Sequence, residues 1–296
     1  MDSPVFIPRV AVASLAFLRS EIPASHPSAA VLGEERMGAG VAVAPDQVLT
    51  AHYLVLGAAR AQVTGADGRP RGVRRMSVDH ESGLALLFLD GAPLRPAALA
   101  EKPATPGMPV FLLTCTSEQE RKGASGHVSM VGPFEAFWEY MLDGAIMTTA
   151  INPGLAGGPL LDLDARLVGI ISLGLAAVGR YSLAIPVELF LARRAEMESE
   201  EPAAGPRRAW LGFYPQGHEG GVAISGVVPG GPAEKAGLLR GDLILSVDGQ
   251  SVSSLRELYR ALWRKGPGEP LGMQVLRESA IHVVEVVAGD RYEFYK

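Results

Sequence analysis

The sequence of 296 residues is poor in cysteine, and its histidines are widely separated. Its single thiol, Cys115, excludes an intrachain disulfide and any metal site built from several cysteines. The six histidines show no HxH, HxxxH or HExxH spacing. We therefore expect neither a metal site nor a cofactor.

The chain also lacks a strong net charge and a long hydrophobic run. A net charge of -5 is too mild to indicate a nucleic-acid partner. The longest uncharged apolar stretch, 167–179, is shorter than the about 20 residues that a membrane helix needs, so no membrane span is predicted. The apolar stretch 11–18 favours a buried first strand over a signal peptide. The expected location is cytoplasmic if the chain is full length, or the cell envelope or periplasm if an export signal was removed.

Turn-forming residues are abundant, with Gly 35 and Pro 22. Between the turns lie short apolar runs of the length expected for strands, at 39–51, 83–90, 109–115, 127–132 and 166–176. Many short strands with few helices indicate a mainly β fold, either a barrel or a sandwich.

The composition changes once along the chain, at 197–208, where an acidic stretch is followed by Pro, Gly and Ala. We interpret this stretch as a linker between a first domain, 1–196, and a second, 209–290, with a tail at 291–296. A helix starting at Pro186 should close the first domain, with Val187, Phe190 and Leu191 on one face. The second domain is predicted to be small and α+β, with a hairpin turn at Asp248-Gly249 and a helix over 254–264 capped by Ser253 or Ser254.

Three segments in order, VLTAHYLVLGA at 48–58, VDHESGLALLFLD at 78–90 and AINPGLAGGPLLD at 150–162, give the chain a family resemblance. With WLGF at 210–213 and the 226–249 segment, they resemble bacterial HtrA-type serine proteases of protein quality control, from about residue 9 to about residue 289. The resemblance implies a trypsin-like double β-barrel followed by a small α+β PDZ domain.

The same resemblance places the catalytic triad at Tyr53, Gly83 and Ala156. A serine nucleophile needs a neighbouring imidazole as its base and a carboxylate that orients the imidazole, and none of these groups is present. We therefore predict a pseudoprotease, not an enzyme, in which the Tyr53 phenol fills part of the former active site and its hydroxyl finds a polar partner or water. The backbone N–H groups of Gly154 and Ala156 would remain as an oxyanion hole.

Other interpretations of these positions stay open. An engineered Ser-to-Ala change would explain Ala156 but neither of the other two positions. His52, one residue before Tyr53, could serve as a shifted histidine. Ser125, Ser129 or Cys115 could provide a different nucleophile, although no base is evident beside them in the sequence.

The predicted working site is the groove of the second domain. The loop of Trp210, Leu211, Gly212 and Phe213 resembles the carboxylate-binding loop of the family. The resemblance implies that its backbone N–H groups bind a peptide carboxylate and that the peptide adds a strand beside it. Two helical residues, Leu258 and Leu262, would help to line the pocket for an apolar terminal side chain.

The expected partners are therefore C-terminal peptides or unfolded segments with apolar ends, bound by an adaptor or regulator. The alternative is an active or cryptic endopeptidase or chaperone of the HtrA type. The family also suggests a homo-trimer or a mixed oligomer with an active relative.

Overall fold

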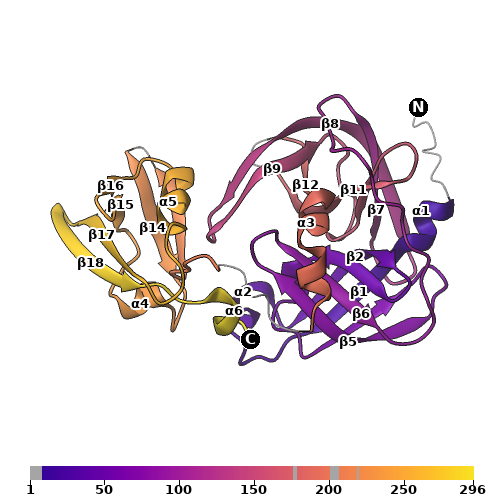
Figure 1. Ribbon diagram of the computed structural model, residues 1–296, viewed down its shortest axis with the longest axis horizontal. Coiled ribbons are helices and arrows are strands. Elements are labelled where there is room, and N and C mark those ends of the chain that lie inside the picture. The colour runs from indigo at the N-terminus through magenta and orange to yellow at the C-terminus, as the bar shows by residue number, and fades with distance from the viewer. Residues whose placement is uncertain (1–8, 176–178, 201–206, 219) are drawn as a thin grey trace. The chain divides into compact units, whose positions relative to one another are not determined.

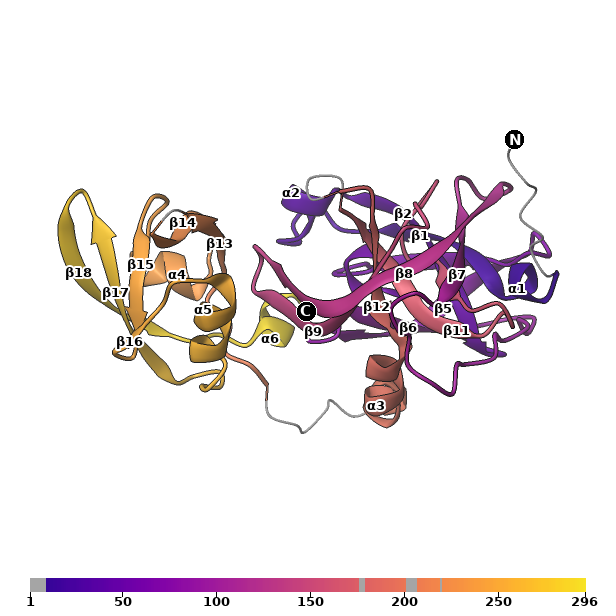
Figure 2. The same cartoon turned by 90° about the horizontal axis from the view of Figure 1, so that it is seen from above.

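The computed structural model describes residues 9–175, 179–200, 207–218 and 220–296, and most of its elements are labelled in Figures 1 and 2. The chain forms two compact units. The first unit comprises 1–133 and 143–203, and the second comprises 134–142 and 204–296. The short segment 134–142, which lies inside the first domain predicted from the sequence, thus groups with the second unit. Of the predicted linker 197–208, residues 201–206 lie outside the described residues.

The first unit contains two closed six-stranded barrels. The first barrel has the order β1-β2-β3-β6-β5-β4, with β1 Leu15–Glu21, β2 Glu35–Ala44, β3 Gln47–Ala51, β4 Arg60–Thr64, β5 Pro70–Asp79 and β6 Leu84–Leu89. The second has the order β10-β11-β12-β9-β8-β7, with β7 Pro109–Cys115, β8 Arg121–Ala136, β9 Tyr140–Thr148, β10 Pro159–Leu161, β11 Leu167–Gly174 and β12 Ser182–Pro186. The predicted double β-barrel is confirmed.

Helices in the first unit are short, except at its end. They are α1 Arg9–Ser14, α2 Ala29–Leu32, the 3-10 helix η1 His52–Leu54 and α3 Val187–Glu198. The strand expected over 11–18 starts only at Leu15, because pairing with β2 begins there, opposite Val41. Helix α3 starts directly after Pro186, as predicted, and runs to Glu198, two residues past the predicted domain end. Val187 and Phe190 are buried, whereas Leu191 is 43% exposed, so the prediction for Leu191 was wrong.

The second unit is built on one antiparallel sheet with the order β13-β14-β15-β17-β18, and β16 pairs with β15. Its elements are β13 Phe213–His218, β14 Gly221–Val227, α4 Pro232–Lys235, β15 Leu243–Val247, β16 Gln250–Ser251, α5 Leu255–Leu262, β17 Pro270–Arg277, β18 Ala280–Val287 and α6 Arg291–Phe294. The predicted turn is present, since Asp248 and Gly249 both have positive φ. Ser254 caps α5 by accepting a hydrogen bond from the Glu257 N–H.

Candidate functional site

Tyr53 lies in η1, where the chain turns sharply after the buried strand β3. Its hydroxyl donates to the carbonyl of Ser172 on β11 at 2.7 Å. Burial raises the pKa of this phenol to about 12, so the group keeps its proton at neutral pH and does not act as a base. The prediction that the Tyr53 hydroxyl finds a polar partner is confirmed.

Gly83 ends the loop between β5 and β6 and has a φ of +79°. Its carbonyl accepts the backbone N–H of His52 at 2.9 Å and lies 3.0 Å from Nδ1 of the same histidine. The backbone carbonyl of Gly83 therefore orients the buried His52 ring. By the family resemblance, position 83 would carry the carboxylate that orients a catalytic imidazole. The His80 ring stands edge-on to it, with the ring centroids 5.6 Å apart.

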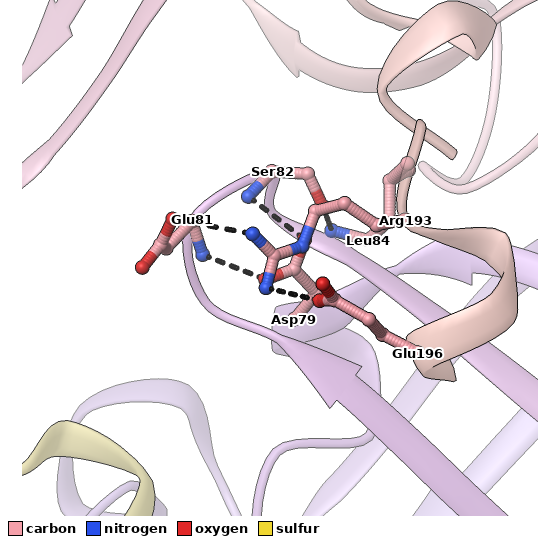
Figure 3. Close-up of polar contacts among 6 residues, drawn as sticks. All are labelled: Asp79, Glu81, Ser82, Leu84, Arg193 and Glu196. Carbon is pink, nitrogen blue, oxygen red and sulfur yellow. Dashed lines mark hydrogen bonds and ion pairs between the residues drawn. The ribbon is translucent and has the colours of Figure 1, made fainter. Parts of the chain in front are cut away.

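An ion pair with a buried carboxylate fixes the shape of this loop. Asp79 accepts a hydrogen bond from the Ser82 hydroxyl and pairs with Nε of Arg193 at 3.0 Å. Figure 3 shows Arg193 reaching from α3 to the loop, where its guanidinium also meets Glu81 and Glu196. Only 3% of the Asp79 side chain is exposed, so its carboxylate contacts loop residues and Arg193 instead of solvent.

The loop 149–158 meets the Tyr53 segment through backbone contacts. The carbonyl of Ala156 accepts the N–H of Ala39 at 2.7 Å, and the N–H of Gly157 donates to Ile171, next to Ser172. A Cβ on Gly157 would lie 2.4 Å from the hydroxyl oxygen of Thr50. The structure thus brings the Tyr53, Gly83 and Ala156 segments together in the first unit.

The predicted oxyanion-hole donors lie in the same loop. The Gly154 N–H donates to the Asn152 side chain at 3.2 Å, and the Leu155 N–H donates to the Cys115 carbonyl. The Asn152 amide group in turn donates to the Leu155 carbonyl. In this state, the Gly154 N–H is satisfied within its own loop.

The alternative nucleophiles differ in their access to solvent. Cys115 is fully buried, and burial raises the pKa of its thiol to about 11, which disfavours the reactive thiolate. Ser125 and Ser129 are exposed on β8. No group of three or more metal-ligating side chains occurs among the described residues. In that same part of the chain, no helix is long and apolar enough to cross a membrane.

The predicted carboxylate loop of the second unit already holds a carboxylate. Glu139 accepts the Leu211 N–H at 2.8 Å with one oxygen, and the Gly212 and Phe213 N–H groups at 2.8 and 3.3 Å with the other. Gly212 has a φ of +74°, which lets three successive N–H groups converge. Sequence reasoning missed Glu139, because a glutamate following two aromatic residues carries no recognisable signal.

The apolar residues predicted to line the peptide pocket are inaccessible in this state. At most 1% of each side chain is exposed, and they share one buried cluster with Met141; they are Leu211, Phe213, Leu258 and Leu262. The Trp210 ring instead packs on Phe294 of α6, with the centroids 4.5 Å apart.

The trypsin-like peptidase domain family matches residues 38–170, and the PDZ domain family matches residues 209–287. A probable periplasmic serine endoprotease DegP-like from Halomonas elongata is 29% identical over 89% of this chain and 59% of its own length. Serine protease HTRA1 from Xenopus laevis is 26% identical over 85% of this chain and 58% of its own length. The solved HtrA-type protease AlgW with decapeptide is 25% identical and covers 96% of this chain and 97% of its own, with a TM-score of 0.57.

These relatives correct one prediction. The substituted triad positions predicted that the chain is not an enzyme, whereas the curated proteins that match 84–92% of it are named as serine endoproteases. The prediction of a non-enzyme is therefore wrong, and peptidase activity becomes a candidate function. The chain spans somewhat more than half the length of these curated relatives.

Each half of the chain has its own independent match, and the two matches stand in the order found in HtrA-type proteases. The mainly β structure agrees with both, since a double barrel covers 38–170 and a small sheet with short helices covers 209–287. The chain is therefore a trypsin-like peptidase domain followed by a PDZ domain, the organisation of the HtrA-type proteases.

Proposed function

We propose that this chain recognises protein segments through its PDZ domain, by capturing a carboxylate at the loop Leu211–Phe213. The carrying observation is the convergence of three backbone N–H groups on the two oxygens of one carboxylate. A free peptide C-terminus presents the same group and would accept the same donors. The solved relative AlgW, described with a bound decapeptide, supports peptide binding as the role of this domain.

The strand that follows the loop suits an extended peptide. β13 is an edge of the sheet and pairs with β14 alone among the described strands. An added peptide strand would use the free backbone groups of this edge, while its terminal carboxylate meets the loop. The apolar side chains around the loop favour a peptide that ends in Val, Leu, Ile or Ala.

A peptide binding assay tests this proposal. We expect a peptide ending in Val to bind with a Kd of about micromolar, roughly -8 kcal/mol, since a flexible ligand loses freedom when it binds. C-terminal amidation removes the charge that the three N–H groups meet, so it should abolish binding. Fluorescence polarisation with matched free-acid and amidated peptides measures the difference, and equal affinities would exclude the carboxylate site.

Changing the ligand is a cleaner test than changing Gly212. A valine there would have to adopt a φ of +74°, which is strained for a β-branched residue. Its Cβ would also lie 3.0 Å from the Trp210 ring. A loss of binding in Gly212→Val would therefore mix a local folding defect with the loss of the site.

Endoproteolysis is the second candidate function, favoured by the names of the relatives. We propose that Tyr53, Gly83 and Ala156 occupy the triad positions of this chain. Their side chains supply no nucleophile, base or orienting carboxylate, so hydrolysis by this chain would use other groups.

Ala156→Ser is accordingly expected to leave the peptidase activity of the chain unchanged. The phenol at position 53 keeps its proton and donates to Ser172, so it offers the new hydroxyl no base, and triad members act as a unit. Casein cleavage and fluorophosphonate labelling measure the effect. The triple variant with Tyr53→His and Gly83→Asp restores all three groups and is the matched comparison, since aspartate tolerates a positive φ better than most residues. Labelling of Ala156→Ser above the rate of the parent would contradict the triad assignment.

Assembly forms the remaining part of the proposal. A homo-trimer or a mixed oligomer with a relative stays a prediction from the family resemblance. Light scattering of the chain alone, and of the chain mixed with a peptidase relative from the same genome, tests it.

A further inference from the structure

We propose that the segment 134–142 is an internal ligand of the PDZ domain, which occupies the carboxylate loop through Glu139 and must leave before a peptide can bind. This inference rests on the proposed peptide-binding function and adds a competitor to it. Both the segment and the loop belong to the second unit, so the contact is internal to that unit.

The Glu139 carboxylate makes the contacts that a peptide terminus would make. Its two oxygens accept all three N–H groups of the loop, and only 4% of the residue is exposed. A second carboxylate has no place beside it, because all three N–H donors of the loop already go to Glu139. Peptide and Glu139 therefore compete for one site.

The backbone of Glu139 supports a functional role. The residue ends the turn between β8 and β9 with a φ of +55°, a conformation that glycine adopts readily and other residues rarely. In a three-residue hairpin loop of this kind, the left-handed position usually carries glycine. A strained glutamate at this position is held by its surroundings, which here are the loop amides.

Further contacts hold the segment in place. The Tyr259 hydroxyl of α5 donates to the Ala136 carbonyl and accepts the Glu139 N–H, and Arg256 pairs with Glu135 at 2.6 Å. Arg291 of α6 donates to the Glu139 carbonyl at 3.2 Å. These contacts belong to the turn and leave the edge of β13 unpaired, so an incoming peptide could pair with the strand before it displaces Glu139.

Met141 gives the segment an apolar component. It is 8% exposed and joins the buried cluster that includes Leu211, Phe213 and Leu258. One carboxylate and one apolar side chain, two residues apart, thus meet the same groups that a peptide with an apolar C-terminus would meet. The segment resembles the predicted ligand in its chemistry.

The competition should depend on pH. Burial raises the pKa of Glu139 from 4.5 to about 7, opposed by the loop amides and by Arg291. The tyrosines that interact with it are Tyr259 of α5, Tyr214 of β13 and Tyr295 after α6, and Glu135 of β8 interacts with Tyr259. A raised carboxyl pKa makes the docked state strongest below pH 4.5, and docking weakens as the pH rises to about 7.

The test compares peptide affinity in the full chain and three variants, with a fluorescein-labelled peptide ending in Val. Glu139→Gln replaces one accepting oxygen with an NH2 group that cannot accept a loop N–H, and Glu139→Gly removes the whole carboxyl group while suiting the positive φ of the turn. Both should bind the free-acid peptide about tenfold more tightly than the parent, because the competing state is lost. Asp143→Asn, an equal charge change at an exposed position outside the segment, should bind as the parent does.

The parent should also bind more tightly at pH 8 than at pH 5, whereas Glu139→Gln should show no change over that range. Equal affinities of parent and both Glu139 variants for the free-acid peptide would overturn the internal ligand and leave the peptide site standing. If neither the parent nor any of the three variants binds the peptide, the proposed peptide-binding function fails. Hydrogen exchange then tests by itself whether Glu139 occupies the loop. Faster exchange at Leu211, Gly212 and Phe213 in both Glu139 variants would support it, and unchanged exchange would overturn it.

Discussion

Gly157→Ala is expected to destabilise the first unit by more than about 4 kcal/mol, which is exceptional for one methyl group. Gly157 has a φ of +92°, and a Cβ there would lie 2.1 Å from the carbonyl oxygen of Ala39. That oxygen belongs to the backbone of β2, so it cannot move without breaking the barrel. All three tryptophans lie in the second unit, so urea denaturation is followed by far-UV circular dichroism, which should show the first unit unfolded or nearly so.

Gly174→Ala is the matched control for this prediction. A Cβ at Gly174, at the end of β11, would meet no atom within 4 Å. We expect a change of less than about 0.5 kcal/mol, as for an ordinary surface substitution. A Gly157→Ala protein as stable as Gly174→Ala would show that the loop does not pack on β2 as described.

Asp79→Asn is the second large effect, with an expected loss of about 2–3 kcal/mol of stability in the first unit. The substitution removes the buried charge that pairs with Arg193 and accepts the Ser82 hydroxyl. Arg193 is 30% exposed and regains some solvation, which keeps the cost below that of a fully buried pair. Chemical denaturation at neutral pH measures the loss.

Glu196→Gln separates this effect from a general loss of charge around Arg193. Glu196 pairs with the same guanidinium at 3.0 Å but is 47% exposed, so its removal should cost less than about 1 kcal/mol. Equal destabilisation by the two substitutions would mean that the network in Figure 3 acts through net charge instead of fixing the loop at Gly83.

The sequence predicted the fold well because its signals are local and repeated. Short apolar runs between turns indicated the barrels, Pro186 marked the start of α3, and Asp248-Gly249 marked a hairpin turn. The prediction for 11–18 was partly wrong, since apolar composition alone does not show where a strand finds its partner. Strand β1 begins at Leu15, where pairing with β2 begins.

The candidate sites were only partly predictable for the same physical reason. The loop Leu211–Phe213 was predicted because WLGF at 210–213 resembles the carboxylate-binding loop of the family, and Gly212 supplies the positive φ that the turn needs. Its occupant, Glu139, lies 72 residues before Leu211 and is brought there by tertiary structure alone. Leu258 and Leu262 were predicted to line an open pocket, but they lie in a closed cluster of buried residues that Met141 also joins.

The central claim is that the amides of Leu211, Gly212 and Phe213 form a carboxylate site, and their amide proton shifts test it most directly. A ¹H–¹⁵N spectrum of Glu139→Gln is recorded with a free-acid peptide and with its amidated form. The account predicts downfield shifts at these three amides with the free-acid peptide alone, as charge-assisted hydrogen bonds form. Identical shifts with both peptides, or no change at these amides on saturation with the free-acid peptide, would contradict it.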